Sequence, residues 1–477
     1  MNTITELECD GTTLAEKETV NKLVNNARVA MEAFSDADQA RVDEAVTAIG
    51  WSIYKPERAR ELAELAVKDT GLGNVESKFI KNQRKTFGCL RDLMRVKTVG
   101  VIEEIPEKGL VKYGKPVGVV GAITPSTNPA ATPVNKAMFA IKGGNAVIIA
   151  PSPAGLKTTT TTVNYMRAEL EKIDLPANLV QVLPPPVNKA LTQELMKAAD
   201  LIVVTGSQNN VRRAYSSGTP AIGVGAGNVP VVIDQCADFA AAAEKICASK
   251  IFDNSTSCSS ENSVIILNSV YDQAIEALKN AGGYMCSTEE KENLRNSLWI
   301  DGHLNRHVIA KDAPVLAEIF DLGHAAEEAK FFMVEEGAVD PESKFTDEKL
   351  SLVLTIYRAN DMDQAVDQLK TIVEVCGKGH SVGIHTETPE HATKLAEEID
   401  VVRVLVNQAH TFGNGGSFDN GLNFTLSMGC GTWAGNSITD NLNYKNFINI
   451  THLVKTIPVD KPSEEELFGG HWSKVGK

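Results

Sequence analysis

The sequence feature that most constrains the fold is a set of short, continuous apolar runs that begins near residue 117 and alternates with helical stretches. The runs are Val117–Ile123, Ala146–Ala150, Asn178–Leu183, Leu201–Thr205 and Val229–Ile233. Residues 156–171 and 189–199, which lie between them, have the spacing of amphipathic helices. Strands that are apolar throughout are typical of parallel sheets covered on both faces. The pattern predicts an α/β fold with a doubly wound parallel sheet, as in nucleotide-binding domains.

The alternation restarts after residue 234 and predicts a second α/β unit. A helix at 239–252 leads through a polar loop to further apolar runs at 263–267, 353–357, 382–385 and 403–406. The N-terminal part is helical, with helices expected around Val20–Phe34 and after an N-cap at 35–38. We therefore expect a cofactor-binding domain with N-terminal helices in 1–234, a catalytic domain in 235–425 and a C-terminal segment in 426–477.

The charge balance limits the partners of the chain. Its 477 residues carry a formal net charge of −14, which argues against nucleic acid or an anionic membrane as the main partner. No apolar run approaches the roughly 18 residues that span a bilayer. Residues 1–10 lack the basic start and apolar centre of a signal peptide, so we expect a cytoplasmic protein.

Eight dispersed cysteines contain no CxxC pair and show no metal-ligand spacing with the histidines. We expect reduced thiols and no metal site. Cys258 differs from the others because Ser, Thr and Asn flank it in a loop between a predicted helix and a predicted strand. Small neighbours leave a sulfur approachable, as a nucleophile requires, although most lone cysteines are structural. Cys430 is the rival, but its glycine-rich surroundings favour close backbone packing.

Two loops follow predicted strands, where ligands bind in open α/β sheets. Asn128, in the first, has an amide that can stabilise an oxyanion, although taken by itself the residue is better explained by an Asn-Pro turn. The second, Gly206-Ser207, precedes a helix at 208–215, whose N-terminus can receive a phosphate. The glycines of 223–227 have the spacing GxGxG rather than GxGxxG and precede a strand, so we reject them as a dinucleotide-binding loop.

Five segments together resemble the aldehyde dehydrogenase superfamily, and within it the coenzyme A-acylating branch, over about residues 20–455. They are KPVGVVGAITPSTNP, VTGSQNNVRRAYSSGTPAIGVGAGN, FDNSTSCSSENSV, DEKLS and LSMGCGTWAGNS. The resemblance implies two doubly wound domains with a small oligomerisation element, and a homodimer or homotetramer. Its reaction would be the reversible oxidation of an aldehyde to an acyl-CoA through a cysteine thioester.

Matched residue by residue, the resemblance assigns roles to positions of this chain. Cys258 corresponds to the nucleophile and Asn128 to the amide that holds the oxyanion. Glu348 corresponds to the acid that binds the nicotinamide ribose. Further cofactor contacts fall on Thr124, Pro125, Ser152, Gly206, Ser207 and Gly225.

Two departures from the hydrolytic members of the family are informative. Val224 stands where those enzymes carry the glutamate that activates water, and valine cannot act as a general base. We therefore expect the acyl group to pass to coenzyme A, since a thiolate needs less activation than water. Residues 149–157 lack the glutamate and lysine found near the adenine ribose, so NAD and NADP both remain open.

The segment 407–421 resembles that of acylating enzymes for anionic aldehydes, sulfoacetaldehyde dehydrogenases first and succinate-semialdehyde dehydrogenases second. Arg403, Asn407 and His410 are the candidates for holding the distal anion; the alternative is that they serve structure alone. Two other interpretations are an acylating enzyme for acetaldehyde or propionaldehyde and a non-catalytic protein of the same fold. A non-catalytic protein is disfavoured because Cys258, Asn128 and Glu348 occur together.

Overall fold

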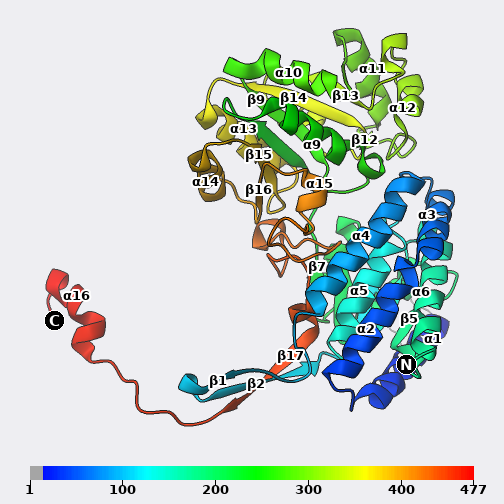
Figure 1. The fold of residues 1–477 in the computed structure, drawn as a ribbon, viewed down its shortest axis with the longest axis vertical. Helices are drawn as coiled ribbons and strands as arrows, with labels where there is room; N and C mark the ends of the chain where they lie inside the picture. Colours follow the sequence, from blue (N-terminus) through cyan, green and yellow to red (C-terminus); the bar gives the residue numbers. More distant parts are fainter. Residues whose placement is uncertain (1–13) are drawn as a thin grey trace, which may run out of the picture.

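The computed structural model describes residues 14–477, and within them two parallel sheets each lie in their own hydrophobic core (Figure 1). The α/β class with two doubly wound units is therefore confirmed. The predictions for residues 1–10 and for Cys9 fall outside the described residues. No helix in the described part of the chain is long and apolar enough to cross a membrane.

The first sheet has five parallel strands in the order β5-β4-β3-β6-β7. Their bounds are β3 Val119–Ile123, β4 Ala146–Ala150, β5 Val180–Val182, β6 Leu201–Val204 and β7 Ala221–Gly223. Every residue of β3, β4 and β6 is buried, as the apolar runs predicted. The helices of this unit are α1 Leu14–Phe34, α2 Gln39–Tyr54, α3 Pro56–Thr70, α4 Val75–Leu93, α5 Ala131–Lys142, α6 Leu156–Glu171, α7 Lys189–Ala198 and α8 Gln208–Tyr215.

Local signals explain where several of these helices begin. Asp38 accepts a hydrogen bond from the backbone of Arg41 and so caps α2, inside the predicted capping segment. Asn74 caps α4 in the same way. One face of α4 is buried although it carries Lys78 and Lys81, and these side chains point toward the second domain. A buried cationic face requires buried partners.

The second sheet has seven parallel strands in the order β10-β13-β14-β9-β8-β15-β16. They are β8 Val229–Ile233, β9 Glu261–Leu267, β10 Gly283–Met285, β13 Phe331–Glu335, β14 Val353–Ala359, β15 Val382–His385 and β16 Val404–Val406, with a short hairpin of β11 Trp299–Ile300 and β12 His303–Leu304. The helices are α9 Phe239–Ile251, α10 Tyr271–Asn280, α11 Thr288–Leu298, α12 Ala313–Ile319, α13 Met362–Val375, α14 Pro389–Glu398 and α15 His410–Gly413.

The chain changes sheets earlier than the predicted boundary at 234. β8 pairs with β9 and β15, so Val229–Ile233 belongs to the second unit rather than the first. The glycines of 223–227 form the crossing between β7 and β8, so they follow one strand as well as preceding another. No helix begins at this crossing, so it lacks the strand–loop–helix form of a Rossmann phosphate-binding loop.

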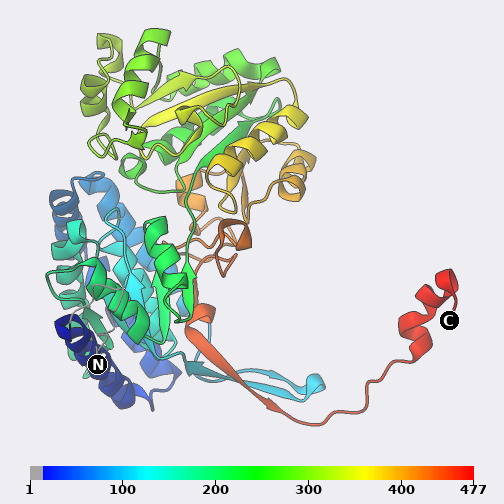
Figure 2. The same ribbon diagram turned by 180° about the vertical axis from the view of Figure 1, so that it is seen from behind.

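The C-terminal segment returns to the first unit and then leaves the body of the molecule. Phe424, Leu442 and Phe447 join the first hydrophobic core. β17 Ile448–Val454 then pairs antiparallel with β2 Leu110–Pro116, which pairs with β1 Gly100–Ile105. From this three-stranded ribbon an extended stretch leads to α16 Glu464–Val475, which lies apart from both sheets in both views (Figure 2). A role in oligomerisation stays a prediction.

Candidate active site

The carboxyl ends of β3, β4 and β6 open into one cavity of about 1340 Å³ between the two units. The loops after these strands line it, because neighbouring parallel strands end at the same sheet edge. The second unit completes the wall. Nine of the predicted site residues lie on it: Thr124, Pro125, Asn128, Ser152, Gly206, Ser207, Gly225, Cys258 and Glu348.

Cys258 lies in the loop that joins α9 to β9, facing the crossing between the two sheets. At Gly227 a Cβ would lie 2.1 Å from the Cys258 carbonyl oxygen, so only glycine permits this approach. Val224, three residues before, lines the same cavity and is largely buried. At this position the crossing therefore presents an apolar side chain and no group that can accept a proton.

The surroundings of Cys258 disfavour its thiolate in the free protein. Burial, followed by the nearby Glu348 and Cys430, raises the pKa of the Cys258 thiol to about 12. Burial, followed by Asp347, likewise raises the pKa of Glu348 to about 8. At neutral pH the cavity therefore holds a thiol and a mostly protonated acid.

The chain approaches Cys258 through a strained turn. Asp253, Asn254 and Ser255 have φ angles of 52°, 53° and 61°, a left-handed run that non-glycine residues adopt only when their surroundings fix it. Asn254 is fixed by hydrogen bonds to Asn74, Asp312 and the Ala310 carbonyl, and the Ser255 hydroxyl donates to the Lys250 carbonyl.

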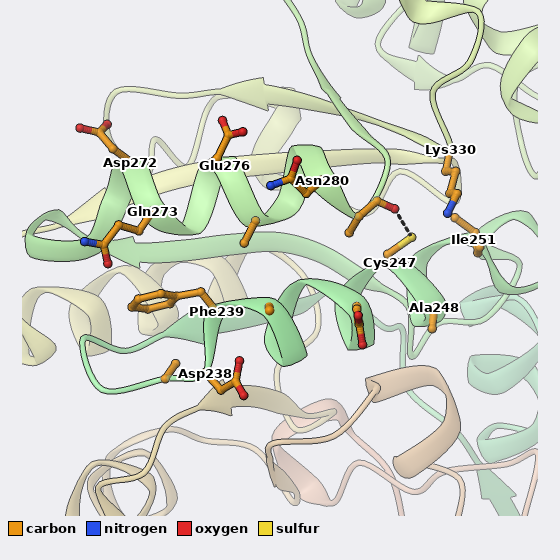
Figure 3. A pocket seen from close by; sticks show the side chains of 15 residues that line it. Asp238, Phe239, Cys247, Ala248, Ile251, Asp272, Gln273, Glu276, Asn280 and Lys330 are labelled. Atoms are coloured by element: carbon orange, nitrogen blue, oxygen red, sulfur yellow. Dashed lines mark hydrogen bonds between the residues drawn. The ribbon is translucent and has the colours of Figure 1, made fainter.

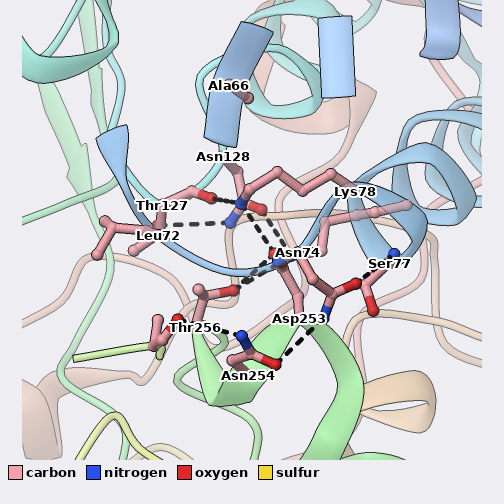
Figure 4. Close-up of polar contacts among 12 residues, drawn as sticks. Ala66, Leu72, Asn74, Ser77, Lys78, Thr127, Asn128, Asp253, Asn254 and Thr256 are labelled. Carbon is pink, nitrogen blue, oxygen red and sulfur yellow. Dashed lines mark hydrogen bonds and ion pairs between the residues drawn. The ribbon is translucent and has the colours of Figure 1, made fainter. Parts of the chain in front are cut away.

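Asp253 is fully buried and anchors this turn to α4 (Figure 4). Its carboxylate accepts from Lys78 at 3.0 Å, from Lys81 at 2.5 Å and from the Thr256 hydroxyl at 2.8 Å. Burial alone would raise the pKa of Asp253, but the two lysines hold it below its usual value. The loop of Cys258 is thus attached to a helix of the other unit by a buried ion-pair cluster.

The same lysine orients Asn128. Lys81 Nζ donates to Asn128 Oδ1 at 2.7 Å, so the oxygen end of the amide is held on α4. The amide nitrogen of Asn128, Nδ2, lies on the other side of the group and donates one long hydrogen bond of 3.5 Å to the Thr127 hydroxyl. An amide fixed in this sense presents an N–H donor to an oxyanion.

Glu348 is placed by a buried lysine next to it in the chain. Lys349 is fully buried and donates to the carbonyls of Phe345 and Asp347, which fixes the turn that carries Glu348. Asn262 of β9 donates to the Asp347 carbonyl and accepts from the backbone of Lys349. The acid therefore reaches the cavity from a rigid turn of the second unit.

At the other end of the cavity the N-terminus of α8 faces the loops of the first sheet. Ser207 caps this helix, and Gln208, Asn209 and Asn210 of its first turn also line the wall. Arg212, Arg213 and Lys189 are the nearby cations on that wall. Backbone N–H groups at a helix start together with cations suit a phosphate-bearing cofactor.

Comparison with known proteins identifies the architecture. The model of the aldehyde dehydrogenase family matches residues 1–286. The chain is 49% identical over 464 residues to an acylating sulfoacetaldehyde dehydrogenase of Cupriavidus necator, which covers 97% of this chain and 94% of that protein. The chain belongs to the aldehyde dehydrogenase family.

Two further relatives place the chain within the family. An acetylating succinate-semialdehyde dehydrogenase of Clostridium kluyveri is 36% identical over 458 residues, 96% of this chain and 100% of that one. A crystal structure of an acetylating aldehyde dehydrogenase from Geobacillus thermoglucosidasius superposes with a TM-score of 0.90 at 33% identity, covering 94% and 99%. The chain groups with the acylating aldehyde dehydrogenases, as its motifs indicated.

Three predicted substrate residues of this aldehyde dehydrogenase are not on the cavity wall. Arg403 is buried and donates to Asn414, Asn441 and the carbonyls of Gly429 and His380, so its guanidinium serves the C-terminal segment. The Asn407 side chain is hydrogen-bonded to both backbone groups of Thr386.

His410 also contacts a residue away from the cavity wall. Its ring contacts the Ser381 hydroxyl at 2.9 Å, and burial, followed by Arg403 and His385, lowers its pKa to about 3. A neutral buried imidazole offers no charge to an anion. None of the three residues lies on the cavity wall, and their role in binding the anion stays a prediction.

The rival thiol and the second cavity supply no side chain to the wall of this cavity. Cys430 is fully buried and does not line the wall. A separate cavity of about 1130 Å³ between α9 and α10 contains Cys247 and Lys330 but none of the predicted site residues (Figure 3). Within residues 14–477, no group of three or more His, Cys, Asp or Glu side chains is arranged to hold a metal ion.

Sequence reasoning missed the lysines of α4. Lys78, Lys81 and Lys85 recur at intervals of three and four residues, which places them on one face of a helix. The spacing of these lysines in the sequence already predicts a cationic helix face. Its meaning depended on the partner Asp253, which lies 172 residues from Lys81 in the sequence.

The raised pKa of Cys258 predicts slow alkylation of the free enzyme. The rate at which iodoacetamide alkylates Cys258 is measured against pH by peptide mass mapping. It should still increase with pH near pH 10, above the ordinary thiol pKa of about 8.5. Glu348→Gln removes an acidic neighbour and should lower the thiol pKa, so that alkylation is faster at the same alkaline pH. A midpoint near pH 8.5, or no change in the variant, would contradict this electrostatic account.

The Lys81–Asn128 contact predicts that Lys81 acts as a positioning residue. Asn128→Ala should lower kcat by roughly 10²- to 10³-fold, as the loss of an oxyanion donor does. Lys81→Met should lower kcat by roughly tenfold or more with little change in KM, because the amide is no longer fixed. In the Asn128→Ala background it should cost less, and the loss that remains reports the contact of Lys81 with Asp253. If Lys81→Met lowered kcat equally with and without Asn128, Lys81 would not act through Asn128. Lys97→Met, at an exposed lysine, is the matched control.

Proposed function

We propose that the chain oxidises a small anionic aldehyde, sulfoacetaldehyde first among them, to its acyl-CoA with NAD(P)+, reversibly and through a thioester on Cys258. The observation that carries the proposal is the charge of the cavity. Among residues 14–477, five cations line it, Lys85, Lys189, Arg212, Arg213 and Arg306, against the single acid Glu348, in a chain of net charge −14. Such a surface favours anionic ligands.

The proposed chemistry begins at Cys258. Its thiol loses a proton, and the sulfur attacks the aldehyde carbon to give a hemithioacetal whose oxyanion accepts from the Asn128 N–H. When bound, NAD(P)+ accepts the hydride of that carbon, and the acyl group is left on Cys258 as a thioester. Coenzyme A, as its thiolate, then takes the acyl group and Cys258 leaves as thiolate, so the sum consumes aldehyde, CoA and NAD(P)+ and yields acyl-CoA, NAD(P)H and a proton.

The identity of residue 224 supports transfer to coenzyme A over hydrolysis. Valine offers no proton acceptor to a water beside the thioester, and its backbone carbonyl already accepts from Gln208. A thiol is acidic enough to attack with less help. Glu348, as the one acid on the wall, is the group that a hydrolytic activity would have to use.

The residues present fit a dinucleotide. Thr124, Pro125, Ser152, Gly206, Ser207 and Gly225 would hold it, with the pyrophosphate near the N-terminus of α8 and the nicotinamide ribose at Glu348. Arg212, Arg213 and Lys189 favour a cofactor or co-substrate with an additional phosphate, which NADP and coenzyme A share. We leave NAD and NADP as alternatives of the proposal.

Other aldehydes are the runner-up substrates: succinate semialdehyde, which is also anionic, and the neutral acetaldehyde and propionaldehyde. A non-catalytic role is less well supported because the thiol, amide and acid meet in one cavity. We further propose a cytoplasmic homodimer or homotetramer. The exposed apolar side chains Val454, Leu467 and Phe468 along the C-terminal arm support an oligomer.

The substrate proposal predicts the order of kcat/KM in an aldehyde panel at saturating coenzyme A. Sulfoacetaldehyde should exceed succinate semialdehyde, and both should exceed acetaldehyde and propionaldehyde, because the cavity is cationic. Formation of NADH or NADPH is measured with each cofactor in turn. A neutral aldehyde as the best substrate would contradict the proposal, whereas Cys258→Ala, the control, should abolish turnover of every aldehyde.

A further inference from the structure

Lys85 lies on the same helical face as Lys81, four residues later, and on the wall of the cavity that contains Cys258. Residues spaced this way on a helix have Cβ atoms roughly 5–6 Å apart. Lys81 holds the amide of Asn128, so Lys85 is one helical turn from the lysine that orients the expected oxyanion donor.

The ammonium group of Lys85 is incompletely partnered. It donates to the Gly415 carbonyl at 2.8 Å, and no ion pair with an acidic side chain is formed by Lys85 within residues 14–477. The charged groups that act on it, Arg84 and Lys81, are both cations. Burial, followed by these two neighbours, lowers the pKa of Lys85 to about 7. A half-buried amine beside cations, with N–H donors left over and facing a cavity, is a site for an anion.

The surroundings of Lys85 are built around it. At Gly415 a Cβ would lie 2.8 Å from Lys85 Nζ, so a larger residue would displace the amine. The centre of the Phe424 ring lies 5.4 Å from the same nitrogen, so the amine makes a cation–π contact with it. Thr425 and Leu426, which follow Phe424, line the cavity beside it. This end of the cavity is formed by α4 and the C-terminal segment, and none of the predicted cofactor residues belongs to those two elements.

We propose that Lys85 binds the sulfonate of the aldehyde substrate and so determines the preference for an anionic over a neutral aldehyde. This inference rests on the proposed function. Lys85 takes the role first expected of Arg403, Asn407 and His410, none of which lies on the cavity wall. Lys81 and Lys78 contribute to the positive field but are paired with Asp253, whereas Lys85 keeps donors for a ligand.

The test compares sulfoacetaldehyde with propionaldehyde, in which a methyl group replaces the sulfonate, in the wild type, Lys85→Met and Lys85→Arg. Lys85→Met should lower kcat/KM for sulfoacetaldehyde by roughly 10- to 100-fold, the worth of a charge-assisted hydrogen bond. The value for propionaldehyde should be unchanged or higher, which also shows that the variant folds. Lys85→Arg should keep part of the preference, and Lys97→Met should keep all of it.

A second measurement needs no oxidation of the charged aldehyde. Ethanesulfonate, which carries the sulfonate without an aldehyde, should inhibit propionaldehyde oxidation competitively in the wild type and roughly 10-fold or more weakly in Lys85→Met. The role of Lys85 would be overturned if Lys85→Met lost kcat/KM equally for both aldehydes or kept the wild-type preference. It would also be overturned if the variant raised the KM for coenzyme A and not that for the aldehyde. A wild type that does not prefer sulfoacetaldehyde would instead refute the proposed substrate, so the two failures are distinct.

Discussion

The buried ion pair between Lys81 and Asp253 connects the two halves of the active site. Lys81 stands on α4 of the first unit and Asp253 on the loop that carries Cys258 in the second, 2.5 Å apart. Removing one partner of such a pair leaves a buried charge and costs about 3–5 kcal/mol. Since Lys81 also holds Asn128, a single ammonium group sets the position of the thiol loop and of the oxyanion amide together.

The left-handed turn at 253–255 follows from the same constraint. Three non-glycine residues with positive φ are costly, and the cost is met by the contacts of Asp253, Asn254 and Ser255 with α4 and the surrounding loops. The turn directs the chain so that Cys258 reaches the cavity and Gly227 can pack against it. Strain is thus concentrated next to the reactive group, while the strands on either side remain regular.

The sequence was sufficient for the features that depend on local pattern. The buried strands, the helices α6 and α8 and the cap of α2 all follow from apolar spacing and capping residues. The motifs located nine residues that meet on one cavity wall. What the sequence could not provide were contacts between distant segments: Arg403 resembles an anion-binding residue until its partners in 380–441 are known, and the lysines of α4 resemble a solvated face until Asp253 is found beside them.

The distribution of charge connects these observations with selectivity. An acidic chain that encloses a cationic cavity attracts anionic small molecules to one place and repels them elsewhere. On the same cavity wall Val224 stands where a hydrolytic enzyme would carry the glutamate that activates water. A thioester formed there would be reached by a thiol more readily than attacked by an unassisted water.

The fate of the acyl group is therefore the central claim, and pre-steady-state kinetics without coenzyme A test it most directly. The enzyme is mixed rapidly with sulfoacetaldehyde and NAD(P)+, and reduced cofactor is followed by absorbance. We expect a burst of about one reduced cofactor per active site, then almost no turnover until coenzyme A is added, since the thioester on Cys258 persists. Continuous turnover without coenzyme A would mean that water reaches an activated thioester, and the account based on Val224 would be wrong.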